Sequence, residues 1–335
     1  MSPLERTTRI VAASQLSGGI FRTERATERL LDSMAEAAKQ GVELLAFPEC
    51  YLGGYPYWRG NVSVKHETEL AARLYEASVS QDSEVVSEID RHARSLGLSV
   101  VVGANERDPR PGAASMFNSA FVFHAERGFV GSHRKLVPTH TERAYWSPGG
   151  ADDLRVFSLP LGRVGSLICY EHHMLTARLA TALLGEEIHC ALWPGYWETA
   201  SHIADKTPGN APANVEIDAV VRDYAMSSQN FVVSANAYLR EADVPADVAP
   251  YLGYNLARGG SSVVDASGRY LRAPLVDEEG LVVAEIDFRD RLVTKCYLDS
   301  IGHYARWDLF DLTLDGRSLV RPSASPGSAG SAASA

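Results

Sequence analysis

The feature that most constrains the fold of this chain is the alternation of short, apolar, β-branched runs with longer amphipathic segments along almost its whole length. Runs of this kind are typical of strands buried in a sheet. We expect strands at residues 9–13, 44–47, 99–103, 119–123, 165–169, 189–193, 231–235 and 261–264. Strands that alternate with helices predict an α/β protein, in which the helices pack on the sheet.

The segments between these runs carry the period of an α-helix. Between the first two strands, Leu30, Met34 and Ala37 fall on one helical face, and Gly41 follows as a stop signal. The same pattern predicts helices at residues 85–96, 175–184 and 215–228.

No internal repeat and no long linker divides the chain, so we expect one domain over residues 1–321. The composition agrees with a packed core, since 45% of the residues are hydrophobic and 22% are charged. From Pro322 onward the residues are small and polar, and they cannot bury enough apolar area to offset the entropy of ordering. Residues 322–335 are therefore expected to form a disordered tail.

The formal net charge of −10, without a dense block of Lys or Arg, argues against nucleic acids and membrane surfaces as partners. The first twenty residues interleave charged and polar groups, unlike a secretory signal, and no apolar run is long enough to span a bilayer. The cysteines lie far apart, which is not the pattern of a disulfide framework: Cys50, Cys169, Cys190 and Cys296. We therefore expect a soluble protein of the reducing cytoplasm.

Four reactive side chains fall at or just beyond the ends of predicted strands, where α/β proteins tend to place ligands. Glu49 lies in "FPEC", Lys135 and Glu142 lie in "HRKLVPTHTER", and Cys169 lies in "ICYEHH". Each residue alone has a structural interpretation, because buried charges are usually paired and buried free cysteines are usually inert. Two carboxylates, one ammonium and one thiol together indicate a catalytic site.

These motifs, with "GGYP" after the first and "GHYARWDL" near the end, resemble in order those of the nitrilases of the carbon-nitrogen hydrolase superfamily. The resemblance implies a four-layer α-β-β-α sandwich. It also implies a Glu-Lys-Cys catalytic triad of Glu49, Lys135 and Cys169, with Glu142 as a second family glutamate. Members of the family pair through helices and often extend into spirals, so the resemblance implies a homodimer or a larger homo-oligomer, with residues 302–308 near the assembly surface.

The chemistry of a nitrile explains why such residues are needed. The nitrile carbon is a modest electrophile and requires a thiolate, so Glu49 would take the proton of the Cys169 thiol. Lys135 would stabilise the charge that gathers on the nitrogen, and Glu142 would hold Lys135 and orient the water. The expected path runs through a thioimidate and a thioester to the carboxylic acid and ammonia. It needs no metal and no organic cofactor.

Other residues near the thiol have alternative interpretations. Glu171 is expected to fasten the corner by hydrogen bonds rather than to reach the substrate, and Cys50 is expected to belong to the core. His172 and His173 suggest a Cys-His dyad, but dyad partners are usually distant in the chain, which makes His140 the better dyad candidate, second to Glu49. Cys169 and its neighbouring histidines lack the paired spacing of a structural zinc site.

Aromatic residues near the strand ends are candidates for the lining of a substrate pocket, since ligand sites are mostly apolar. Those we expect to contact the substrate are Tyr55, Tyr170, Trp193 and Tyr196. Asn118 is expected to open a strand and fasten a loop.

The sequence departs from the nitrilase pattern at Tyr170, where many nitrilases carry tryptophan, at "ARWD", where proline is usual before the aspartate, and in the loop after "GGYP". Substrate preference is therefore open. An amidase or carbamoylase could use the same four residues, because a thioester also forms from an amide. A protein of another class, a noncatalytic assembly or binding protein on this fold, would not need a buried ion pair beside a thiol.

Overall fold

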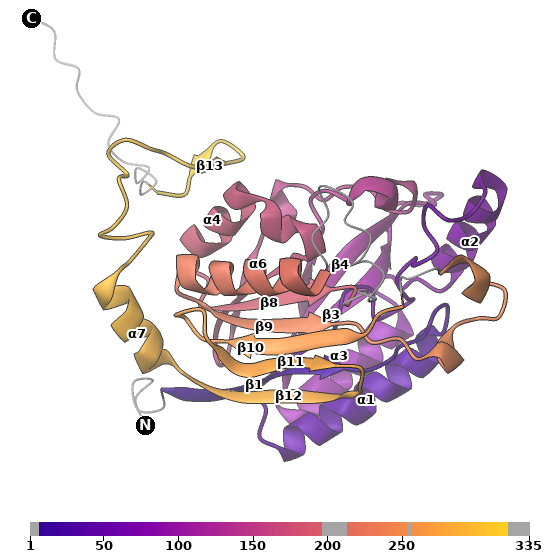
Figure 1. Cartoon of the computed structure of the whole chain (residues 1–335), viewed down its shortest axis with the longest axis horizontal. Helices are drawn as coiled ribbons and strands as arrows, with labels where there is room; N and C mark the ends of the chain where they lie inside the picture. The colour runs from indigo at the N-terminus through magenta and orange to yellow at the C-terminus, as the bar shows by residue number, and fades with distance from the viewer. Residues whose placement is uncertain (1–6, 196–212, 253–255, 321–335) are drawn as a thin grey trace, which may run out of the picture.

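The computed structural model describes residues 7–195, 213–252 and 256–320 and consists of two six-stranded sheets packed face to face (Figure 1). The first sheet has the order β12-β1-β2-β3-β4-β5. Its strands are β1 (Thr8–Gln15), β2 (Leu44–Ala46), β3 (Ser99–Arg107), β4 (Met116–His124), β5 (Gly128–Arg134) and β12 (Gly280–Asp287). The pairs β1/β2 and β2/β3 are parallel and the others are antiparallel, so the sheet is mixed.

The second sheet has the order β11-β10-β9-β8-β7-β6 and is also mixed, with β7, β8 and β9 parallel. Its strands are β6 (Val156–Leu159), β7 (Gly162–Ile168), β8 (Ile188–Trp193), β9 (Phe231–Asn236), β10 (Gly259–Val264) and β11 (Tyr270–Val276). A short hairpin near the C-terminus, β13 (Thr313–Leu314) with β14 (Arg317–Ser318), is not hydrogen-bonded to either sheet, and Leu314 packs against a cluster that includes Leu167 of β7.

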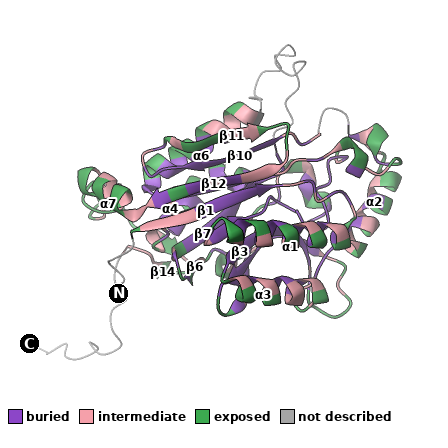
Figure 2. Ribbon diagram, turned by 90° about the horizontal axis from the view of Figure 1, so that it is seen from below, coloured by how far each residue is buried: buried purple, intermediate pink, exposed green. Residues whose placement is uncertain are grey.

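Helices cover the outer face of each sheet, which gives four layers. In Figure 1, α1 (Thr23–Lys39) and α3 (Glu84–Leu96) lie on one side of the strands, and α4 (Leu175–Leu183) and α6 (Ala213–Ser228) lie on the other. Figure 2 shows the strands largely buried and the outer faces of α1 and α3 exposed. The predicted α-β-β-α sandwich is confirmed.

Side chains from the two inner faces of the sheets form the central core, which includes Val11, Val101, Ile168 and Val233. A second core lies between the first sheet and its helices, where Leu30 and Met34 of α1 pack. Both faces of the central strands are covered, which explains why those strands read as continuous apolar runs in the sequence.

The predicted strands are all present, and most of them extend one to three residues beyond the expected bounds. The sequence pattern did not predict β5, β6, β11 and β12, nor α2 (Val64–Glu76) and α7 (Phe288–Tyr297). These elements carry mixed polar and apolar residues because they are half-exposed or lie at a sheet edge. No residue of α7 is buried, so a helical face of buried residues is lacking there.

The chain leaves the sandwich with α7 and runs along its outside to residue 320 (Figure 1). Large hydrophobic side chains are exposed along this segment: Leu292, Val293, Tyr297, Tyr304, Leu309 and Phe310. Trp307 fastens the turn at residues 302–308 by donating from Nε1 to the carbonyl of Ile301. The predicted disordered tail lies outside the described residues.

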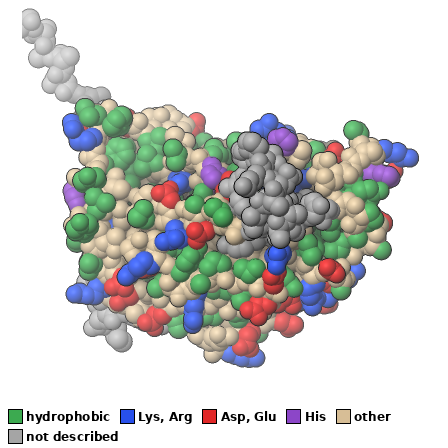
Figure 3. Space-filling view, viewed as in Figure 1, with side chains coloured by type: hydrophobic (Ala, Val, Ile, Leu, Met, Phe, Trp, Pro, Cys, Tyr) green, Lys and Arg blue, Asp and Glu red, His purple; other side chains and the backbone are tan. Residues whose placement is uncertain are grey.

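Figure 3 shows acidic and basic side chains interspersed on the face in view, without a single large basic area. Among the described residues, no helix is both long and apolar enough to cross a membrane.

Candidate active site

Four side chains from separate elements meet at one edge of the two sheets. Glu49 follows β2, Lys135 follows β5, Glu142 lies on a 3-10 turn (His140–Ala144), and Cys169 begins another 3-10 turn (Cys169–His173) directly after β7. One carboxylate oxygen of Glu49, one of Glu142 and the Cys169 sulfur all lie within 4.8 Å of one another. All four side chains are buried, and Cys169 is 1% exposed. The strand ends therefore bring together the groups that the sequence singled out.

Lys135 stands between the two carboxylates. Its Nζ donates to Glu49 Oε1 at 3.1 Å and to Glu142 Oε2 at 2.8 Å. Glu142 also accepts hydrogen bonds from the Tyr55 hydroxyl at 2.6 Å and the Thr139 backbone N–H at 2.7 Å. Lys135 is the one cation of this triplet, so removing it would leave two buried carboxylates without their shared partner.

Glu49 is held on one side only. Its Oε1 accepts from Lys135 and from Asn118 Nδ2, the latter at 2.6 Å, whereas Oε2 is buried and has no hydrogen-bond partner among the described residues. A buried carboxylate oxygen with free lone pairs, beside a thiol, is placed to accept a proton.

The surroundings of the two glutamates shift their pKa values in opposite directions. Burial raises the pKa of Glu49 to about 7, against the opposing effect of Lys135. Burial acts in the same direction on Glu142, but Lys135, the Tyr55 hydroxyl and the Thr139 N–H outweigh it and lower its pKa. Glu49 is therefore poised to exchange a proton near neutral pH, while Glu142 stays ionised.

The thiol and the ammonium keep their protons in the resting site. Burial, with Glu49 beside it, raises the pKa of the Cys169 thiol well above its ordinary value. Burial alone would lower the pKa of Lys135, but Glu142 and Glu49 raise it well above the ordinary value. To act as a nucleophile, this thiol would need a base to take its proton, and Lys135 places a positive charge beside the two carboxylates.

The corner that carries Cys169 is sharply bent. Cys169 has φ 53°, in the left-handed region that side chains other than glycine rarely adopt. Glu171 holds the corner by accepting from the backbone N–H groups of Ile168 and Leu136, each at 2.7 Å, and from His133 Nε2 at 2.8 Å. The predicted structural role of Glu171 is confirmed, and so is the placement of Cys50 in the core.

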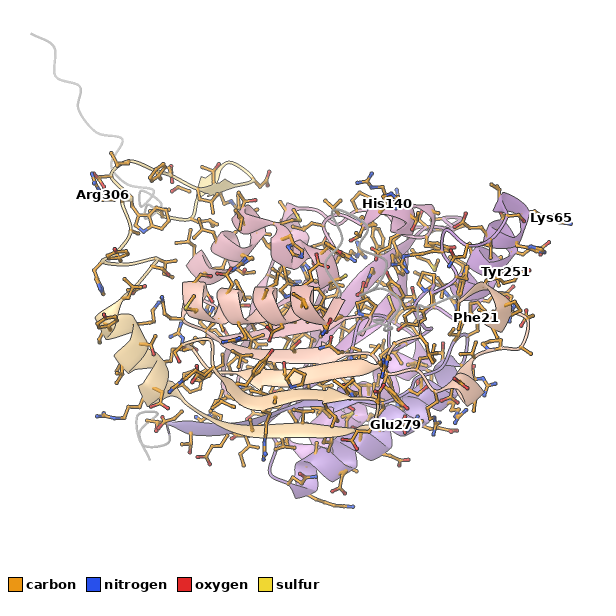
Figure 4. All side chains as sticks on the ribbon, in the orientation of Figure 1. Phe21, Lys65, His140, Tyr251, Glu279 and Arg306 are labelled. Carbon is orange, nitrogen blue, oxygen red and sulfur yellow. The ribbon has the colours of Figure 1, made fainter. Side chains whose placement is uncertain are left out.

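The histidines do not form a dyad with the sulfur. His172 Nδ1 lies 2.7 Å from the carbonyl oxygen of Cys169, and its Nε2 lies 2.9 Å from His189 Nε2. His173 is partly exposed and pairs with Glu216 at 3.2 Å. His140 is exposed, and it lies at the edge of the molecule in Figure 4.

His172 and His189 form a directional chain of hydrogen bonds behind the nucleophile. A carbonyl oxygen only accepts, so His172 Nδ1 carries a proton. Burial, with the adjacent His189, lowers the pKa of His172 well below its ordinary value, so the ring is neutral and its Nε2 accepts from His189 Nε2. The Nδ1 atom of His189 lies 2.7 Å from Glu186, which also accepts from Tyr224. The chain therefore fixes the backbone of Cys169 from inside the protein.

We expect His172→Phe to lower kcat about 10- to 100-fold, because the ring still stacks on Trp193, at 4.6 Å between centroids, but no longer donates to the Cys169 carbonyl. His172→Asn places an amide N–H near the position of Nδ1 and should restore most of the rate. Steady-state kinetics of both variants checks this, with the exposed His173→Phe as the matched control. Equal losses in the Phe and Asn variants would contradict it.

The aromatic residues that we expected to contact the substrate have different neighbours in the structure. Tyr55 lies in the site with its hydroxyl on Glu142, and Trp193 is buried against His172. The hydroxyl of Tyr170 donates to Glu216 Oε2 at 2.8 Å. Tyr196 lies outside the described residues.

Asn118 lies inside β4, two residues after its first residue, rather than at the start of the strand. Its amide donates to Glu49 in the loop that follows β2, so the prediction that it fastens a loop is confirmed. A signal was present in the sequence, because an amide in a buried apolar strand requires a polar partner.

Comparisons with known proteins agree with this geometry. A family profile described as carbon-nitrogen hydrolase matches residues 10–293. The chain is 33% identical over 311 residues to a nitrilase of Paraburkholderia phymatum, covering 91% of this chain and 86% of that one. It is 32% identical over 320 residues to an aliphatic nitrilase of Rhodococcus rhodochrous, which covers 92% of this chain and 82% of that one.

Solved structures show the same fold at low sequence identity. A carbon-nitrogen hydrolase of Helicobacter pylori G27 has a TM-score of 0.69 at 18% identity, covering 90% of this chain and 96% of that one. An amidase of a Nesterenkonia species has a TM-score of 0.62 at 19% identity, and the match covers 92% of this chain and 98% of that one.

Proposed function

The chain belongs to the carbon-nitrogen hydrolase family, and on this premise we propose that it is a nitrilase, which converts a nitrile to the carboxylic acid and ammonia through a covalent intermediate on Cys169. The observation that carries the proposal is the buried cluster of Glu49, Lys135, Glu142 and Cys169. The matched relatives above 30% identity that we cite are named nitrilases, which supports a nitrile as the substrate.

In the first step, the free Oε2 of Glu49 takes the proton of the thiol as the sulfur attacks the nitrile carbon. The carbon–sulfur bond forms, one π bond of the nitrile breaks, and its electron pair becomes a lone pair on nitrogen. Lys135 stabilises that charge, and the proton taken by Glu49 returns to the nitrogen. The product of this step is a thioimidate.

In the second step, a water molecule adds to the thioimidate carbon, and the tetrahedral intermediate expels ammonia to leave a thioester. A second water molecule then releases the carboxylic acid and the thiol. Glu49 acts as the base toward each water. Glu142 holds Lys135 and, through it, the position of the developing charges.

The proposal predicts a pH dependence. For a neutral nitrile, kcat/KM should rise as the pH increases through about 7, because Glu49 accepts a proton only after it has lost its own. Initial rates across the pH range check this, and Glu49→Gln should lose most of its activity at every pH. A Gln variant with the wild-type rate and profile would show that another group is the base.

A panel of aliphatic, aryl and arylacetic nitriles, each with the matching amide, tests the function. Ammonia and the acid should be released from at least one nitrile, faster than from its amide. Faster release from the amides would identify an amidase or carbamoylase. No turnover, together with no selective labelling of Cys169 by iodoacetamide, would favour a noncatalytic protein.

We also propose that the protein acts in the cytoplasm as a homo-oligomer. Its four cysteines are free, which suits a reducing compartment. The exposed hydrophobic side chains of α7 and the segment after it suit burial against other copies of the chain. Sedimentation velocity tests the assembly, and a monomer at micromolar concentration would contradict it.

A further inference from the structure

One arginine beside the active site has a guanidinium that makes no hydrogen bond and no ion pair with any residue that the structure describes. Arg59 is half-buried on the loop that follows the "GGYP" motif. The loop lies against the segment that carries Glu142, since a Cβ placed on Gly60 would lie 3.8 Å from the methyl group of Thr141. Arg59 is therefore held near the catalytic cluster by its backbone.

The guanidinium of Arg59 stacks on an aromatic ring whose hydroxyl binds the cluster. The Cζ atom of Arg59 lies 4.7 Å from the centre of the Tyr55 ring, and the hydroxyl of Tyr55 donates to Glu142. Burial lowers the pKa of Arg59, but Tyr55, Glu142 and Cys169 raise it by more. The guanidinium thus lies within electrostatic reach of the nucleophile.

The guanidinium of Arg59 makes no hydrogen bond and no ion pair within residues 7–195, 213–252 and 256–320; it stacks on Tyr55, and only the backbone N–H of Arg59 donates, to the carbonyl of Pro56. Every other buried or half-buried arginine of these residues donates to a carboxylate, carbonyl or hydroxyl: Arg9, Arg25, Arg29, Arg73, Arg107, Arg134, Arg178, Arg240, Arg258 and Arg291. A charge that is partly removed from water without an acceptor is costly, so an unpaired guanidinium in a site indicates a ligand.

We propose that Arg59 binds a carboxylate group of the substrate, so that the natural substrate is a nitrile that also carries a carboxylate. This inference rests on the proposed nitrilase function. The planar fork of a guanidinium matches the two oxygens of a carboxylate, and a single cation suits a single negative charge. Without Arg59, the cluster would hold two glutamates and the single cation that they already share, Lys135, so no charge there would attract such a substrate.

The test compares charged and neutral nitriles of the same shape. The substrates are ω-cyanocarboxylates of increasing chain length, each paired with the methyl ketone in which a methyl group replaces one carboxylate oxygen. The wild type should prefer the best carboxylate about 10-fold in kcat/KM. Arg59→Met should lose about 100-fold toward that carboxylate, chiefly in KM, and less than about threefold toward the ketone.

The ketone reports on folding, since a variant that turns it over has an intact site. Arg73→Met is the matched control, because Arg73 also stacks on an aromatic ring, at 4.4 Å from Phe21, but is paired with Asp247. Its effects on the two substrates should be equal. Equal losses in Arg59→Met, or a wild type that prefers ketones, would overturn the inference while the nitrilase function stands. If the wild type hydrolyses none of these nitriles or those of the broader panel, the function itself fails.

Discussion

Replacing Cys169 with Ala should abolish nitrile hydrolysis, with a loss in kcat on the order of 10⁵-fold or more, since the covalent intermediate forms on its sulfur. The fold should survive, because the thiol is neutral in the resting site and its removal leaves no charge unpaired. The expected cost in the free energy of unfolding is about 1 kcal/mol for the small cavity. Ammonia release and urea unfolding measure the two effects.

Cys169→Ser is the control that separates packing from nucleophilicity. The hydroxyl nearly fills the space of the thiol but is a far weaker nucleophile here, because the shared base Glu49 would have to remove a proton from a group with a much higher pKa. The Ser variant should therefore be as stable as the wild type and still nearly inactive. Substantial hydrolysis by either variant would reject Cys169 as the nucleophile.

Lys135→Met should both inactivate the protein and lower its free energy of unfolding by about 3–5 kcal/mol. Methionine fills a similar volume, so the loss comes from charge. The ammonium is the shared donor to Glu49 and Glu142, and without it two buried carboxylates face each other. Lys39→Met is the control, because the pair of Lys39 with Glu36 is exposed and should contribute less than about 1 kcal/mol.

The loss in Lys135→Met should depend on pH in a defined direction. Without the cation, the pKa values of both carboxyls in the folded protein exceed those in the unfolded chain, so the folded state holds more protons. The destabilisation should then be largest above pH 7 and shrink as the pH falls toward about 5. Urea unfolding at both pH values measures it. An unchanged stability would show that the acids are not coupled through Lys135.

Much of the fold could be predicted because the central strands are covered on both faces. Leu44, Val101 and Ile168 lie in such strands, and their apolar runs are unbroken. The edge strands β6 and β11 were missed because β6 is only partly buried and β11 has no buried residue, which breaks the apolar pattern. Helix α7 was missed because its apolar residues are exposed, so they do not form a buried stripe.

The residues of the candidate site could be predicted where a reactive side chain comes directly after a strand. Glu49 and Cys169 come directly after β2 and β7, and their residue types stand out against the apolar runs. The supporting residues were harder to predict. The chain from Glu186 through His189 to His172 joins residues of three different elements, and only the packing of β8 against the corner at Cys169 brings them together.

The same limit applies to Arg59. From the sequence alone, an arginine in a polar loop is predicted to be a solvated surface residue. Its significance follows from the ring of Tyr55 beneath it and from the lack of an acceptor among the described residues, and neither can be read from spacing along the chain.

The central claim is that the sulfur of Cys169 carries the substrate during turnover. Mass spectrometry of the protein, quenched with acid while it hydrolyses a nitrile and then digested, tests this most directly. The peptide that contains Cys169 should gain the mass of the thioimidate or the acyl group. The same peptide of Cys169→Ala should show no such gain. An adduct on Cys50, Cys190 or Cys296 that accumulates at the rate of turnover, with Cys169 unmodified, would contradict it.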